Sequence, residues 1–200
     1  MKPHANSRTS VWIYILLWLF FVYLFFQIIG FYQGNVSNVL LGGLYFIQFG
    51  VHETAHIVFG FLPPVLVAAA GSVSEVLFTG LVAFAAFRAK SYFAGVFGLL
   101  WVMLAMKSMG NYMADARAMA MPLIGPSSDP HHDWNFVFGQ LGLLNSDIFI
   151  GTTVQVIGAI IGVIGLMIGL MIIISKLMEP PKTVTAADVR SGPDPRKFYK

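Results

Sequence analysis

The sequence contains no cysteine among its 200 residues. This absence excludes disulfide bonds and zinc sites built on thiolates, and it leaves the redox compartment undetermined. Charged residues are also scarce, at 10% of the chain, whereas a typical soluble domain carries about 25%. Because hydrophobic residues make up 57% of the chain and gather in long runs, the composition predicts an integral membrane protein.

The few charges are unevenly distributed along the chain. The formal net charge is +3, and most basic residues lie in two tails, residues 1–10 and 175–200. Such a pattern is typical of membrane-orientation signals and argues against nucleic acid as a partner. We expect the lipid bilayer to surround the domain between the tails, and the tail at 175–200 to be disordered.

Apolar runs divide the chain into predicted membrane spans, each close to the roughly 20 helical residues that cross a bilayer. They predict one all-α domain, residues 11–174, built as a polytopic transmembrane helical bundle. Its five spans are expected at residues 11–31, 39–62, 65–87, 92–109 and 148–174, and residues 110–147 form the one long polar connection. The last span carries small residues that are typical of close helix packing, at Gly158, Gly162, Gly165 and Gly169.

The orientation of the bundle in the membrane is ambiguous. Five spans would place the two tails on opposite sides, yet both tails are basic. Lys and Arg of the C-terminal tail, together with Arg88 and Lys90, outnumber those of the N-terminal tail and the long connection. The positive-inside tendency therefore favours a cytoplasmic C-terminal tail.

The second run contains the pentapeptide HETAH, from His52 to His56. On a helix, residues four apart lie on one face, so both imidazoles can bind one metal ion. H-E-x-x-H on a helix is a signature of zinc peptidases in which the glutamate is the general base. Because zinc lowers the pKa of a bound water to about 7, we expect Zn²⁺ as the cofactor and Glu53 as the catalytic residue.

The cost of these side chains in hydrocarbon supports a metal site. An ionisable residue at the centre of a bilayer costs about 2.5–3.5 kcal/mol on insertion scales, so residues without a role are rare there. Three such residues within five positions indicate a shared partner. A metal ion explains them better than chance or a purely structural polar patch.

Catalytic zinc normally takes three protein ligands, so the third must come from elsewhere in the chain. The turn after the second span and the connection after the fourth emerge on the same membrane face, which brings residues 110–147 within reach. Asp115 is the preferred ligand, because it needs only a modest extension of the fourth helix. The alternatives are His131, His132 and Asp133, for which the connection would have to fold back.

Glu75 is the other acid inside a predicted span. An intramembrane carboxylate is a functional hypothesis by default. It could be protonated, could pair with Lys107, or could line a path for substrate. The structural alternative is that the flanking hydroxyl side chains satisfy it, at Ser72, Ser74 and Thr79.

HETAH within a span, followed two spans later by an aspartate near a helix end, resembles the site-2 protease family of intramembrane zinc metalloproteases, and more narrowly its small bacterial-type relatives. The resemblance covers about residues 39–115. It implies a helical bundle in the plasma membrane of a prokaryotic cell, with a transmembrane protein as substrate, cut in or near the membrane. It also implies His52 and His56 as zinc ligands and Glu53 as the residue that activates water. The family's aspartate usually lies in Leu-Asp-Gly, whereas Asp115 lies in Met-Ala-Asp-Ala-Arg.

Two other functions remain compatible with the sequence. A membrane zinc hydrolase could cleave a lipid amide or ester with the same activated water. A non-catalytic, metal-binding accessory subunit of a membrane complex would use the histidines for structure or transport. The sequence does not determine the oligomeric state.

Overall fold

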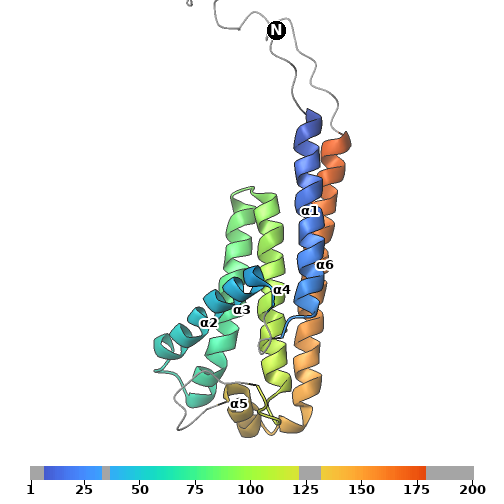
Figure 1. The fold of residues 1–200 in the computed structure, drawn as a ribbon. Coiled ribbons are helices and arrows are strands. Elements are labelled where there is room, and N and C mark those ends of the chain that lie inside the picture. The colour runs from blue at the N-terminus through green and yellow to red at the C-terminus, as the bar shows by residue number, and fades with distance from the viewer. Residues whose placement is uncertain (1–6, 33–36, 122–131, 179–200) are drawn as a thin grey trace, which may run out of the picture.

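The computed structural model describes residues 7–32, 37–121 and 132–178, and within these ranges the chain forms helices and no strands (Figure 1). The predicted all-α fold is therefore confirmed. Residues 1–6 and 179–200 of the two predicted tails lie outside the described residues. The described elements, in chain order, are α1 (Ser7–Ile29), α2 (Val39–Val58), α3 (Pro64–Arg88), α4 (Tyr92–Ala114), the short helix α5 (Asp133–Leu141), the 3-10 turn η1 (Leu144–Ser146) and α6 (Asp147–Met178).

Four segments of the described chain are long and apolar enough to cross a membrane. They comprise residues Val11–Ile29, Pro64–Arg88, Tyr92–Ala114 and Leu144–Met178. These segments correspond to the first, third, fourth and fifth predicted spans. The chain is therefore a membrane protein with a helical bundle, as its composition predicts.

The second predicted span, residues 39–62, behaves differently. It forms α2, but this helix ends at Val58 and is not one of the four apolar segments. The reason is its polar content, because Gln48 and the HETAH residues all lie on it. Pro64 then begins α3, at a position where the missing N–H of proline costs no helical hydrogen bond.

Helix α4 forms the centre of the bundle. Its most extensive contacts are with α6 and α3, and α1 packs against α6 and α4. Figure 1 shows α1 and α6 side by side, α3 and α4 as a helical hairpin, and α2 crossing this hairpin obliquely. Large apolar side chains fill the space between α1, α2 and α4, and they include Leu24, Ile28, Leu41, Val96, Leu100 and Leu104.

The contact between α4 and α6 depends on glycine. A Cβ added to Gly158 would lie 2.8 Å from the Cβ of Met106, and one added to Gly110 would lie 2.5 Å from the carbonyl oxygen of Gly151. Helices in a bilayer associate through such close packing, since lipid tails are as apolar as leucine. The close helix packing predicted for the four glycines of the last span is confirmed, because all four are buried. We call this contact the glycine seam, formed by Gly110 on α4 and by Gly151, Gly158, Gly162, Gly165 and Gly169 on α6.

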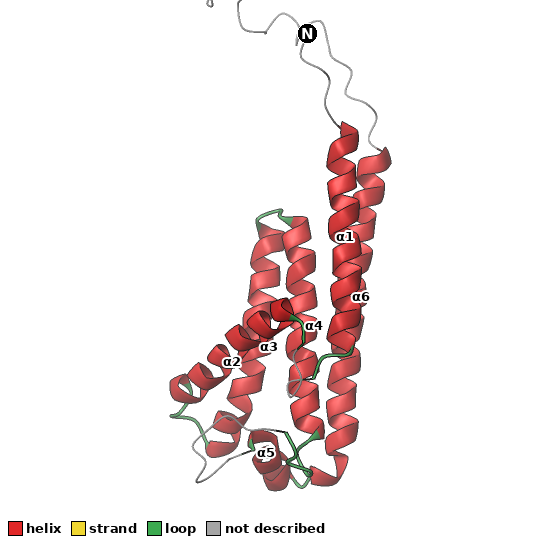
Figure 2. Cartoon of the chain, viewed as in Figure 1, coloured by secondary structure: helices red, strands yellow, loops and turns green. Residues whose placement is uncertain are grey.

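The segment predicted as a long polar connection contains regular structure. Helix α4 continues past the predicted end at residue 109 to Ala114, and α5 and η1 follow at the end of the bundle where α6 begins (Figure 2). Nε of Arg117 donates to Oδ1 of the buried Asp147 at 2.9 Å, and Asp147 also accepts from the backbone N–H of Ile148 at 2.7 Å. This ion pair joins the chain after α4 to the start of α6.

Candidate metal centre

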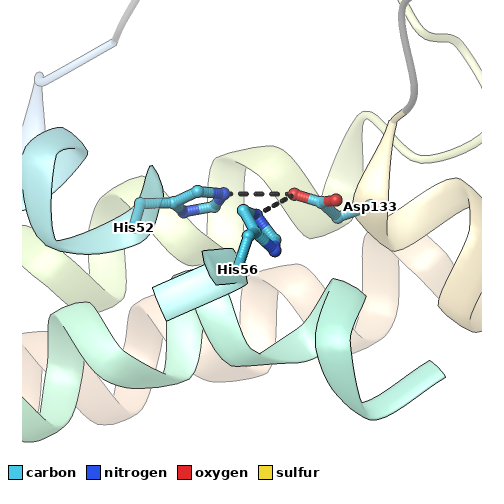
Figure 3. Close-up of side chains that lie close together, drawn as sticks. All are labelled: His52, His56 and Asp133. Atoms are coloured by element: carbon cyan, nitrogen blue, oxygen red, sulfur yellow. Dashed lines mark hydrogen bonds and ion pairs between the residues drawn. The ribbon is translucent and has the colours of Figure 1, made fainter. Parts of the chain in front are cut away.

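Two imidazoles of α2 and one carboxylate of α5 converge at the end of the bundle where α6 begins (Figure 3). Oδ2 of Asp133 lies 3.1 Å from Nε2 of His52 and 3.5 Å from Nε2 of His56. The possible ligand atoms of the three residues all lie within 4.8 Å of one another. In the described part of the chain this is the group of three that could hold a metal ion.

Two of the three separations between these atoms fit a tetrahedral ion. Zinc binds nitrogen and oxygen ligands at about 2.0–2.2 Å, which places neighbouring ligand atoms of a tetrahedron about 3.3 Å apart. The separations of 3.1 and 3.5 Å lie on either side of this value. Imidazole and carboxylate also suit zinc and other divalent first-row metals. The residues present therefore fit a divalent metal with one open coordination position.

The second nitrogen of each imidazole is held by an oxygen of α3. Nδ1 of His56 lies 3.0 Å from the carbonyl oxygen of Val67, and because a carbonyl can only accept, Nδ1 must carry the proton. Nδ1 of His52 lies 2.7 Å from Oε1 of Glu75. In both rings Nε2 is the nitrogen turned toward Asp133. Metal-binding histidines characteristically make such a contact, which fixes the tautomer and the ring orientation.

Glu75 thus has a defined partner, His52, and both side chains are buried. The suggested pairing with Lys107 is wrong, because Nζ of Lys107 instead donates to Oε1 of Gln155 on α6 at 2.6 Å. Ser72 bonds to Trp134, and the hydroxyl of Thr79 donates to the backbone carbonyl of Glu75, so these flanking residues leave the carboxylate to His52.

Close approach of α3 makes room for the first imidazole. A Cβ added to Gly71 would lie 2.5 Å from Nε2 of His52 and 2.6 Å from its Cδ2. Any larger residue at this position would push the ring away from Asp133. Gly80, on the same helix, has no atom within 4 Å of such a Cβ, which makes it a natural control position.

Helix α5 places Asp133 through contacts on both sides of that residue. The backbone N–H of Asp133 donates to the hydroxyl of Tyr112 at 3.0 Å. Nε1 of the buried Trp134 donates to Oγ of Ser72 at 3.1 Å, which fixes α5 on α3. Nδ1 of His132 accepts from the backbone N–H of Asn135 at 3.2 Å and caps the helix. Asp133 is therefore presented by the first turn of a docked helix.

The preferred third ligand, Asp115, lies elsewhere. Its carboxylate accepts from the backbone N–H groups of Ala120 at 3.0 Å and Met121 at 2.9 Å, so it closes the turn after α4. The structure corrects the expectation in this respect, since Asp133, one of the alternatives, is the acid beside the two imidazoles. The reason is that α4 ends at Ala114 and the chain turns away there, while α5 folds back to α2 and α3.

The other two alternatives are separate from the group. His132 is buried, its Nε2 lies 3.4 Å from Oδ2 of Asp115, and its ring packs at a tilt against Tyr112 with centroids 4.2 Å apart. Burial lowers the pKa of His132, and the nearby Asp115 carboxylate opposes this effect. The neutral ring accepts at Nδ1, as the helix cap requires. His131 lies outside the described residues.

Glu53 lies next to His52 on α2, and its side chain is exposed rather than part of the group of three. Sequence reasoning missed two residues that shape the centre, Tyr112 and Gly71. A tyrosine near a helix end and a glycine within an apolar helix carry no distinctive pattern, so neither had a signal that sequence alone could reveal.

No family model, curated protein or solved structure matches the chain. The fold and the candidate centre must therefore be interpreted from their own geometry.

Proposed function

We propose that the chain is an intramembrane zinc metallopeptidase that hydrolyses peptide bonds of membrane-protein substrates. The observation that carries the proposal is the convergence of two Nε2 atoms and one carboxylate oxygen, with both Nδ1 atoms held by oxygens of α3. We place the protein in the plasma membrane of a prokaryotic cell, in keeping with its resemblance to site-2 proteases of bacterial type.

His52, His56 and Asp133 would hold the ion, and Glu75 and Val67 would orient the two imidazoles. A zinc ion bound there would lower the pKa of a coordinated water to about 7 and polarise the carbonyl of the substrate. Three protein ligands and one open position are the usual composition of a catalytic site, whereas structural sites are closed by four.

Glu53 supplies the general base in this proposal. It follows His52 directly on α2, and its exposed carboxylate is free to receive a proton from the attacking water and to return it to the leaving amine. The substrate must offer an extended segment, because the amide groups of an intact helix are already hydrogen-bonded to one another. Local unwinding of a substrate helix near this end of the bundle would provide that segment.

The decisive experiment compares Glu53→Gln with Thr54→Ser, a conservative change at the exposed neighbour. Zinc content is measured by elemental analysis, and cleavage is measured on a helical membrane peptide in micelles. We expect Glu53→Gln to keep its zinc and to lose about 10²–10⁴-fold in rate, the usual worth of a general base. Thr54→Ser should keep both its zinc and its rate of cleavage. Full turnover by Glu53→Gln would contradict the peptidase.

A lipid amide or ester hydrolase is the second candidate. It is favoured by the large apolar side chains that follow the second histidine and are exposed, where lipid can reach them, such as Ile57 and Phe61. The same purified protein is offered lipid and peptide substrates. Turnover of lipid without cleavage of peptide would favour this candidate, and turnover of neither, with zinc retained, would favour an accessory metal-binding subunit.

A further inference from the structure

Basic residues gather at one end of the bundle. Arg88 and Lys90 lie at the turn between α3 and α4, and Lys176 lies in the last turn of α6. Nζ of Lys176 lies 4.7 Å from the ring centroid of Tyr14 on α1, and that centroid lies 5.0 Å from the ring centroid of Phe93, the second residue of α4. The start of α1, the α3–α4 turn and the end of α6 therefore lie at the same end (Figure 1).

The opposite end is acidic and contains the candidate metal centre. The connections at residues 30–38, 59–63 and 115–146 together contain a single Lys or Arg, which is Arg117. Its guanidinium is paired with Asp147, because Nη2 lies 2.8 Å from Oδ1. Apart from Lys107 and Arg117, every Lys and Arg of the sequence lies within residues 1–10, 88–90 or 176–200.

The path of α2 explains how the start of α1 and the end of α6 come to lie on one side. Nδ2 of Asn111 donates to the carbonyl oxygen of Phe31 at 3.1 Å, which places the chain after α1 beside the last turns of α4. The next residue of α4, Tyr112, lies against His52 with ring centroids 6.3 Å apart. The end of α1 and the middle of α2 are thus at the same end of α4. Four crossings remain, α1, α3, α4 and α6, and an even number returns the chain to its starting side.

Membrane proteins keep the Lys- and Arg-rich connections and tails in the cytoplasm. With four crossings the two basic tails no longer conflict, as they do with five. We propose that the His52–His56–Asp133 centre lies at the non-cytoplasmic face of the membrane, and that its substrates are membrane-protein segments presented at that face. The location depends on topology alone, whereas the substrate class also depends on the proposed peptidase activity.

The absence of cysteine makes the orientation directly measurable. Ser91→Cys marks the basic end and Gln140→Cys marks the end with the metal centre, and both positions are exposed. Neither change removes a basic residue, so neither alters the orientation signal itself. Spheroplasts with an intact plasma membrane are treated with a membrane-impermeant maleimide, and the labelling is repeated after permeabilisation. The unmodified chain, which has no cysteine, is the control for background.

We expect Gln140→Cys to be labelled in intact spheroplasts and Ser91→Cys only after permeabilisation. Labelling of Ser91→Cys with protection of Gln140→Cys would overturn the orientation, and so would equal labelling of both in intact spheroplasts. Ala89→Cys and Asn145→Cys, also exposed, form a second pair if one variant fails to accumulate. The labelling result does not depend on metal binding. The orientation can therefore stand if the protein proves to bind no zinc and the peptidase proposal fails, and the peptidase proposal can stand if the orientation is overturned.

Discussion

The glycine seam and the candidate metal centre hold helices together in different ways. At the seam, α4 and α6 approach because side chains are missing, and a Cβ on Gly110 would lie 2.5 Å from the backbone of α6. At the centre, α2, α3 and α5 meet through polar side chains that satisfy one another, as His52 does between Glu75 and Asp133. The seam is suited to stability and the centre to chemistry. Substitutions in one region should leave the other unaffected.

The largest effect is expected from removal of the Asp133 carboxylate, the proposed third ligand. Asp133→Ala should weaken zinc binding by more than about 100-fold, since even the outer contacts of a metal ligand are worth 10–100-fold. Competition with a chromogenic chelator measures the affinity. Asp115→Asn is the matched control, because it changes a nearby acid that closes the turn after α4 and is not one of the three residues of the candidate centre. Equal losses in the two variants would contradict the assignment of Asp133.

These two acids show how far sequence can predict the centre. The HETAH spacing is local, so it suffices to place His52 and His56 on one helical face, and topology suffices to bring the segment after α4 to them. Which of the two acids lies beside the imidazoles is decided by tertiary contacts. It depends on Trp134 docking on Ser72 and on Tyr112 holding the backbone of Asp133, contacts between helices that no local pattern encodes.

The same distinction applies to the fold. Long apolar runs are sufficient to predict four crossing helices, and the spacing of Gly158 and Gly162 predicts close packing. The role of α2 was harder to predict, because its length matches a span while its polar residues lower its hydropathy below that of the four apolar segments. A hydrophobic run interrupted by a polar motif such as HETAH is ambiguous, since the motif itself lowers the hydropathy that defines a span.

The next effect should come from Glu75→Gln, which keeps the shape of the side chain and removes its charge. The amide can still accept a hydrogen bond from Nδ1 of His52, but it no longer raises the basicity of the ring. Zinc affinity should fall by about 10–100-fold, the usual cost of losing such a partner. Ser74→Ala, one residue away on α3, is the control. An unchanged affinity would mean that Glu75 serves only packing.

A smaller effect is expected from crowding the imidazole. Gly71→Ala puts a methyl group 2.5 Å from Nε2 of His52, and overpacking of this kind typically costs about 1–3 kcal/mol. The ring can relieve the clash by turning away from Asp133, so zinc affinity should fall by about tenfold. Gly80→Ala on the same helix meets no atom within 4 Å and should retain full affinity. If the two alanine variants behaved alike, the role given to Gly71 would be wrong.

The smallest effect on the metal is expected at the seam. In Gly151→Ala the new methyl group would lie 2.7 Å from the backbone nitrogen of Ala114 on α4, so the helices must separate, at a cost of about 1–3 kcal/mol in free energy of unfolding. Thermal unfolding in micelles should show a lower Tm than for Gly43→Ala, where nothing lies within 4 Å. Zinc affinity should stay the same in both variants, because α6 contributes no ligand. If Gly151→Ala lost zinc affinity together with stability, the seam would support the centre through α4 and Tyr112, and the two regions would not be independent.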